Sequence, residues 1–263
     1  MAYLLPAEFA TKMVDAGEAK IYMSTRDTLI RAYMAGAILA LAAVFAITIA
    51  VQTGVFLLGA VLFPVGFCML YLMGFDLLTG VFVLTPLAWL AQRPGVTPKQ
   101  ILRNWGLVFL GNFGGALTVA FMMSFIFTMG YNVDGGAIAT KVASIGEART
   151  LGYAEHGAAG WITIFIRGML CNWMVSLGVV GAMISTHVSG KGLAMWMPIM
   201  LFFCMGFEHS VVNMFLFPFG LIMGNLVGGL AFTGLTLYTT HVKTLPKRTI
   251  PVDKAAASQT LPI

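Results

Sequence analysis

The sequence predicts an all-α integral membrane protein with six membrane-spanning helices, arranged as two halves of three in which the second half is inverted. Of the 263 residues, 59% are hydrophobic and only 10% are charged, and the mean hydropathy is +0.90. A soluble domain carries about 25% charged residues. Long apolar runs alternate with short polar ones, and each span needs roughly 20 apolar residues. In addition, three short motifs of the first half recur in the second half.

Residues 1–28 precede the first apolar run and mix acidic with basic side chains, among them Glu8, Lys12 and Asp15. This pattern differs from the basic and then apolar pattern of a secretory signal peptide. We expect a short amphipathic helix on the membrane surface. The first span follows at about 29–51 and ends at the polar turn Gln52-Thr53-Gly54.

The next apolar region, 55–91, is interrupted by Gly74-Phe75-Asp76. It is too long for one span and too short for two spans joined by a loop, so it predicts a broken second helix. A basic loop at 92–100 leads to the third span at about 101–129.

The longest polar stretch, 130–160, separates the third span from the fourth, which we expect at about 161–186. The fifth apolar region begins at Leu193 and is interrupted at Gly206-Phe207-Glu208-His209, which predicts a second broken helix. After Asn213 the chain is apolar again to about Tyr238. We therefore divide the chain into an amphipathic segment 1–28, a six-helix channel domain 29–241 and a basic tail 242–263.

The basic residues predict the orientation. With both termini in the cytoplasm, 12 of the 15 Lys and Arg residues lie inside, Lys141 and Arg149 lie outside, and Arg167 lies within a span. This asymmetry follows the positive-inside rule and requires an even number of crossings. We expect a multi-pass protein of the inner (plasma) membrane. The sequence pI of 9.2 then reflects topology and contact with lipid, and no nucleic-acid partner is expected.

The two halves of the chain resemble each other at three places in the same order. Because three spans per half is an odd number, the second copy must be inverted in the membrane. The paired motifs are Ile30-Arg31-Ala32 with Ile166-Arg167-Gly168, Gly74-Phe75-Asp76 with Gly206-Phe207-Glu208, and Gly111-Asn112-Phe113-Gly114-Gly115 with Gly224-Asn225-Leu226-Val227-Gly228-Gly229.

Inverted repeats with one broken helix in each half are a transport design, with the site near the midplane where the breaks meet. A chain leaves helical geometry inside a bilayer only where it is buried in protein or lines a cavity. The half-helix after each break directs the positive end of its dipole at the midplane, which favours an anion. The alternative is that the breaks are packing kinks.

Several polar side chains fall within the apolar segments, where ionisable groups are functional candidates. Asn112 and Asn225 fit hydrogen bonding between close-packed helices, and Arg167 and Glu208 fit a structural ion pair. His209 lies in a break beside an acid, and histidine is the side chain that titrates most readily near neutral pH. The remaining candidates are Asp76, Asn172 and Asn213.

These residues resemble the formate/nitrite transporter family over nearly the whole chain. The segments that resemble family motifs are Gly206-Phe207-Glu208-His209-Ser210-Val211-Val212-Asn213-Met214, Arg167-Gly168-Met169-Leu170-Cys171-Asn172-Trp173-Met174-Val175, Phe75-Asp76-Leu77-Leu78-Thr79-Gly80, and Pro6-Ala7 with Ala16-Gly17. The resemblance implies an aquaporin-like protomer, a homopentamer with one pore in each protomer, and passage of small monovalent anions such as formate, nitrite, hydrosulfide or lactate.

By the same resemblance, His209 is the central pore histidine, Asn172 faces it and Thr79 belongs to a mobile loop. Constrictions are implied at Phe63, Phe67, Leu77, Val175 and Phe202. We expect the anion to cross together with a proton through His209, with Glu208 holding the imidazole. Moving a bare anion through an apolar ring costs far more than moving its neutral acid.

Two positions depart from the family pattern. The vestibule lysine of the family falls on His156, which predicts acid-dependent capture of the anion unless Lys141 supplies the charge. The stretch after Asn213 is also short, leaving room for one crossing and a short half-helix.

Other function classes are weighed against this one. A neutral-solute channel shares the architecture, but neither break contains Asn-Pro-Ala. A haem-bearing membrane subunit would need paired histidines on facing helices, and His187 and His241 lie at span ends. With no phosphate-binding glycine loop and no metal spacing among Cys68, Cys171 and Cys204, we expect neither an enzyme nor a metal or other cofactor.

Overall fold

The computed structural model describes residues 3–214, 233 and 235–243. In this part of the chain the regular elements are helices, in agreement with the predicted fold class. They are α1 (Pro6–Tyr22), α2 (Thr25–Thr53), α3 (Phe56–Leu62), α4 (Pro64–Leu72), α5 (Leu78–Leu90), α6 (Pro98–Phe127), α7 (Gly136–Ala148), α8 (Leu151–Ala154), α9 (Gly157–Ile184), α10 (Val188–Cys204) and the short π-helical η2 (Tyr238–Val242).

Three helices of the described part are long and apolar enough to cross a membrane: α2, α6 and α9. They coincide with the predicted first, third and fourth spans. Their starts follow local chemistry, since the Ser24 hydroxyl caps α2 by accepting the Asp27 amide (3.0 Å). Thr97 and Gln100 form a capping box at the start of α6, and such caps satisfy amides that lack a partner within the helix.

The second and fifth apolar regions are broken where the sequence predicts. The second region runs through α3 and α4 to Leu72 and resumes at Leu78, and α10 ends at Cys204. A glycine in the left-handed region opens each break, Gly74 with φ 74° and Gly206 with φ 65°. Glycine adopts this conformation without steric cost.

The same four main-chain hydrogen bonds recur in both breaks. In the first break the main-chain N–H groups donate to main-chain oxygens in the pairs Met73 to Met69 (3.1 Å), Gly74 to Tyr71 (3.1 Å), Phe75 to Leu70 (2.9 Å), and Asp76 to Arg31 (3.4 Å). In the second they are Met205 and Leu201 (3.0 Å), Gly206 and Phe203 (3.1 Å), Phe207 and Phe202 (3.0 Å), and Glu208 and Arg167 (3.3 Å). Two of the three predicted motif pairs are therefore equivalent in the backbone as well as in the sequence.

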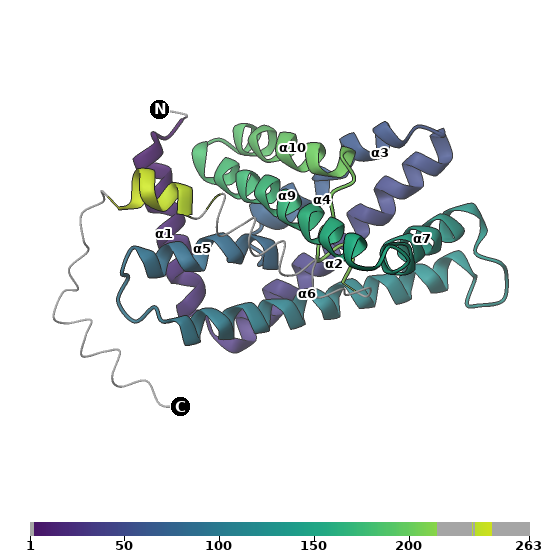
Figure 1. The fold of residues 1–263 in the computed structure, drawn as a ribbon, viewed down its shortest axis with the longest axis horizontal. Coiled ribbons are helices and arrows are strands. Elements are labelled where there is room, and N and C mark those ends of the chain that lie inside the picture. Colours follow the sequence, from purple (N-terminus) through teal and green to yellow (C-terminus); the bar gives the residue numbers. More distant parts are fainter. Residues whose placement is uncertain (1–2, 215–232, 234, 244–263) are drawn as a thin grey trace.

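The long helices form two layers. In Figure 1, α6 runs along one side with α2 behind it, α9 and α10 lie together on the other side, and α5 lies between the layers. Small residues bring α2 and α6 close together: a Cβ on Gly36 would lie 2.1 Å from the Asn112 carbonyl oxygen, and one on Gly115 would lie 2.0 Å from that of Tyr33. Close backbone approach through glycine is typical of helix pairs in membranes.

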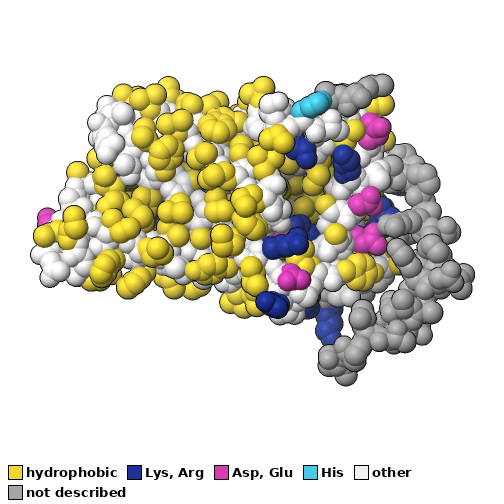
Figure 2. All heavy atoms as spheres, turned by 180° about the vertical axis from the view of Figure 1, so that it is seen from behind, with side chains coloured by type: hydrophobic (Ala, Val, Ile, Leu, Met, Phe, Trp, Pro, Cys, Tyr) yellow, Lys and Arg dark blue, Asp and Glu magenta, His cyan; other side chains and the backbone are white. Residues whose placement is uncertain are grey.

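The outer surface is apolar over most of the face shown in Figure 2, where charged side chains gather toward the end of the molecule that carries α1. Exposed aliphatic and aromatic side chains run along α2 and α6, from Leu41 and Phe45 to Leu110, Phe121 and Phe125. This distribution suits contact with lipid chains rather than water.

Two regions differ from the sequence-based description or fall outside it. The polar stretch 130–160, expected as a connection, contains α7 and α8. Most of the stretch after Asn213, with the last span, the second copy of the third motif, Asn225 and most of the tail 242–263, lies outside the described residues.

Candidate functional site: a buried histidine between two broken helices

The two breaks meet at a single side-chain contact. His209 follows α10, Thr79 lies in the first turn of α5, and both side chains are almost completely buried. Thr79 Oγ1 lies 3.3 Å from His209 Nε2. A polar pair from opposite halves of the chain is thus placed in an otherwise apolar core.

The imidazole of His209 is oriented by its own loop. The Val211 main-chain N–H donates to His209 Nδ1 at 3.1 Å. A nitrogen that accepts this bond carries no proton, so in the neutral imidazole the proton lies on Nε2, toward Thr79. The hydrogen-bond geometry therefore assigns the tautomer and leaves Nε2 as the nitrogen that carries the proton.

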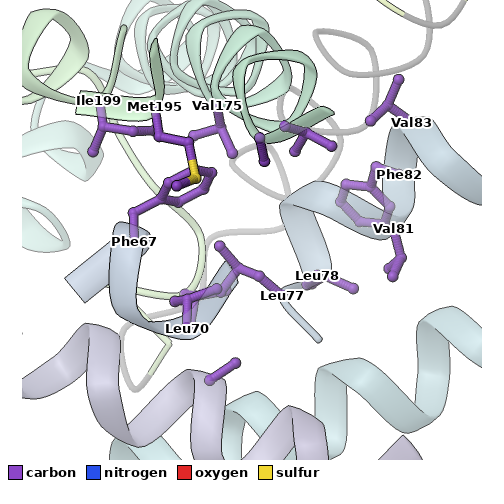
Figure 3. Close-up of a cluster of buried hydrophobic side chains, with 14 of the residues drawn as sticks. Phe67, Leu70, Leu77, Leu78, Val81, Phe82, Val83, Val175, Met195 and Ile199 are labelled. Carbon is purple, nitrogen blue, oxygen red and sulfur yellow. The ribbon is translucent and has the colours of Figure 1, made fainter. Parts of the chain in front are cut away.

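All five predicted constriction residues are buried and belong to one contiguous apolar cluster: Phe63, Phe67, Leu77, Val175 and Phe202. The Phe202 ring lies 5.6 Å from the His209 ring and 5.9 Å from that of Phe63, measured between ring centroids. In Figure 3, Phe67 points toward Met195 and Val175, while Leu77 comes from the far side of the first break. The structure thus brings the apolar residues together around the histidine.

Asn172, predicted to face the histidine, is fully buried on α9. The Ser176 hydroxyl donates to the Asn172 main-chain oxygen at 2.6 Å. Asn172 shares the buried side of α9 with Val175 and Val179. Its position in the core fits the predicted role, which remains a prediction.

Glu208, next to His209, is the centre of a buried polar network. Its carboxylate lies 3.3 Å from Arg149 Nε and accepts the Tyr153 hydroxyl at 2.8 Å and the Asn213 amide. Arg149 also donates to Asn213 Oδ1. Burial, together with the Glu208 charge, raises the pKa of Tyr153 to about 12, so this hydroxyl stays protonated as a donor.

The predicted ion pair of Glu208 has a different cation in the structure. Arg149 is the partner, whereas Arg167 reaches Glu208 through Tyr153, whose hydroxyl accepts from Arg167 Nη1 at 2.9 Å. The carboxylate contacts described here face this network. The imidazole of His209 is held by Val211 and Thr79 instead.

A cavity of about 680 Å³ opens beside this network, and we call it the Glu208 vestibule. Its lining includes Arg149, Tyr153, His156, Arg167 and Glu208. His156 lines this cavity together with two arginines, and its role in anion capture remains a prediction. Lys141, considered as a substitute, lines a separate apolar cavity of about 590 Å³ between α2, α6 and α7.

The other break carries a similar pair, at a place we call the Asp76 mouth. Lys20 of α1 contacts the fully buried Asp76 carboxylate. Asn112 fixes the same loop: its amide donates to the main-chain oxygens of Ala32 (2.7 Å) and Asp76 (2.9 Å), and its side-chain oxygen accepts the Leu78 amide (2.8 Å). The predicted helix-to-helix role of Asn112 is thus combined with support of a break.

Sequence reasoning missed Lys20, Arg149 and Tyr153 as members of the site. No local signal marks Arg149, which lies between α7 and α8 and is 59 residues from Glu208 in the sequence. None marks Lys20 either, which lies 56 residues from its partner. Among the described residues no cluster of three or more His, Cys, Asp or Glu side chains is placed to hold a metal ion.

Comparison with known proteins decides the family. The sequence profile of the formate/nitrite transporter family matches residues 7–239. The chain belongs to this family. The formate channel FocA of Escherichia coli (strain K12) is 30% identical over 227 residues, covering 84% of this chain and 75% of the relative. This formate/nitrite transporter therefore aligns with a formate channel over most of its length.

Two solved structures share the fold. An FNT family ion channel superimposes with a TM-score of 0.73 at 23% identity, covering 88% of this chain and 98% of the other. A pentameric formate channel with formate bound superimposes with a TM-score of 0.66 at 22% identity, covering 82% and 96%. The all-α membrane fold and the family predicted from the sequence are confirmed.

Proposed function

We propose that this formate/nitrite transporter passes small monovalent anions of weak acids, formate or nitrite among them, and that they cross together with a proton through His209. The observation that carries the proposal is one buried histidine where the two breaks meet, within hydrogen-bond reach of Thr79 and beside the ring of Phe202.

The mechanism follows from solvation. An anion entering the Glu208 vestibule finds two arginines against one carboxylate, and so an excess of positive charge. Beyond it, the apolar cluster excludes a bare charge, because transfer of an unpaired ion into such surroundings is very costly. An anion that gains a proton passes the cluster as its neutral acid. The proton comes from water, or from a doubly protonated His209 whose Nδ1 has released the Val211 N–H and which returns to the neutral imidazole by giving up the Nε2 proton.

Each polar residue of the pathway then has a distinct task. Thr79 and Asn172 supply hydrogen bonds to the passing acid at the centre. Val211 holds the imidazole, and the network around Glu208 fixes the loop that carries it. Support for this assignment comes from burial and contacts, together with the family membership of the chain.

The assembly and orientation belong to the same proposal. We propose a homopentamer in the inner membrane, with lipid around it and both termini in the cytoplasm. The fold shared with a pentameric formate channel supports the pentamer. The distribution of Lys and Arg over the loops supports cytoplasmic termini. The apolar outer surface of the long helices fits lipid contact.

The function is tested by uptake of labelled formate into proteoliposomes, with nitrite and hydrosulfide as competitors, at about pH 5 and about pH 8. We expect uptake that competitors reduce and that is stronger at the lower pH. Absence of anion flux at either pH, with the oligomer intact by size-exclusion chromatography, contradicts the proposal. Water flux without anion flux would point to a neutral-solute channel instead.

A further inference from the structure

The Glu208 vestibule holds two guanidinium groups that come from different elements. Arg149 follows α7, and Arg167 lies in α9. Both line the same cavity of about 680 Å³, and Tyr153 stands between them, donating to Glu208 and accepting from Arg167. The two groups are thus linked through one phenol and one carboxylate.

The charges of this vestibule do not cancel. Glu208 is paired with Arg149. Among the described residues no carboxylate pairs with Arg167, whose side chain is exposed, donates to Tyr153 and lies over the Tyr153 ring at 5.9 Å. A guanidinium does not lose its proton in proteins. Arg167 therefore presents a permanent positive charge to the cavity, whatever the protonation state of His156.

The arrangement of the hydrogen-bond donors on this cation matters as much as its positive charge. A guanidinium offers planar, paired donors that match the two oxygens of a carboxylate or of nitrite, whereas an ammonium is a compact point charge. Lysine supplies the buried cation at the Asp76 mouth, through Lys20. The two ends of the pathway therefore differ in the type of cation and resemble each other in the backbone.

We propose that Arg167, backed by Arg149 and Tyr153, forms an oxyanion-binding site in the Glu208 vestibule that takes planar anions with two oxygens. This inference rests on the proposed function. It names the geometry of the anion that the entrance of the pathway prefers. Formate and nitrite are bound there in preference to anions with a single acceptor atom, such as hydrosulfide or chloride. Tyr153 orients the Arg167 guanidinium, and the Arg149–Glu208 pair keeps the carboxylate from neutralising it.

The test is an exchange of cations that keeps the charge. Arg167→Lys retains the positive charge and removes the paired donors. Arg93→Lys is the matched control, since Arg93 pairs with Asp15 and Glu18 of α1 and is not among the residues that line the vestibule. The half-saturating formate concentration and the rate of hydrosulfide uptake are measured in proteoliposomes for wild type and both variants. We expect Arg167→Lys to raise the half-saturating formate concentration by about fivefold and to leave hydrosulfide uptake within about twofold, with no change in the control.

A binding measurement separates this inference from the proposed function. Formate, compared with chloride at equal ionic strength, should raise the melting temperature of the purified wild-type oligomer and of Arg93→Lys, and have less effect on Arg167→Lys. Equal loss of formate and hydrosulfide uptake in Arg167→Lys, or an unchanged preference for formate in both measurements, overturns the oxyanion site. A wild type without anion flux overturns the proposed function alone, and its melting temperature in formate still decides the site.

Discussion

His209 is held in one orientation by a main-chain donor two residues further along its own loop. Because the Val211 N–H occupies Nδ1, the neutral imidazole presents its Nε2–H, a hydrogen-bond donor, toward Thr79. The charged groups nearest to this loop, Glu208 and Arg149, are paired with each other. The imidazole of His209 therefore lies beside a charge pair that is already matched within itself.

We predict that His209→Gln conducts but loses its pH dependence. The glutamine amide donates to Thr79 in place of Nε2 and does not titrate near neutrality. Formate uptake should rise severalfold in wild type between about pH 8 and about pH 5 and vary by less than about twofold in the variant. His187→Gln, at an exposed histidine before α10, is the control and should follow wild type. An unchanged pH profile in His209→Gln would remove the role we assign to the imidazole.

At the scale of elements, α2 and α6 approach each other closely because glycines at their contact carry no side chain. A Cβ on Gly115 would lie 2.0 Å from the Tyr33 carbonyl oxygen and 2.7 Å from the Ala37 nitrogen, both main-chain atoms. Main-chain atoms of a packed helix cannot turn away as a side chain does. The same contact region carries Asn112, which fixes the first break, so the spacing of these two helices also sets the position of Thr79.

We predict that Gly115→Ala lowers stability and Gly114→Ala does not. The two glycines are neighbours in α6, but a Cβ on Gly114 would meet only the Tyr33 ring, at 3.6 Å, an ordinary contact. Overpacking of this kind costs about 1–3 kcal/mol, so Gly115→Ala should melt at a lower temperature in detergent. The measurement is thermal unfolding followed by size-exclusion chromatography. Equal melting temperatures of the two variants would show that α2 and α6 separate easily.

The elements were predictable to the extent that their signals are local. A glycine followed by an acid inside an apolar run marks both breaks, and the repeated motif around Asp76 and Glu208 marks them as equivalent. Arg149 was missed because its contact with Glu208 depends on how α7 and α8 fold back over the chain, which no local pattern encodes. α1 was predicted as a surface helix, yet Met13 is fully buried and Gly17 lies against the Leu84 carbonyl, and these contacts also depend on distant residues.

For the whole molecule, the paired breaks imply a definite orientation in the membrane. One break is joined to α1 through Lys20 and the other to the 130–160 segment through Arg149. If the positive-inside rule holds, α1 lies in the cytoplasm and α7 lies outside. The Glu208 vestibule is then the outer entrance.

We predict that an impermeant thiol reagent labels Asp134→Cys in intact cells and does not label Lys12→Cys. Both positions are exposed, one between α6 and α7 and the other in α1. The native cysteines, of which Cys68 and Cys171 are buried and Cys204 is half-buried, are first replaced by alanine. After the cells are broken open, both variants should react. The reverse pattern in intact cells would invert the assigned topology.

The unlike cations at the two ends, lysine at one and arginine at the other, have a consequence for kinetics. A pathway that carries an anion together with a proton obeys detailed balance, so its net flux is driven only by the combined gradients of the two. Entrances of unequal affinity nevertheless give unequal half-saturation concentrations from the two sides. The maximal rates must then differ by the same ratio, as the Haldane relation requires. We therefore expect the half-saturating formate concentration to differ between the inner and the outer side of the membrane, while the combined gradients of anion and proton still set the direction of flux.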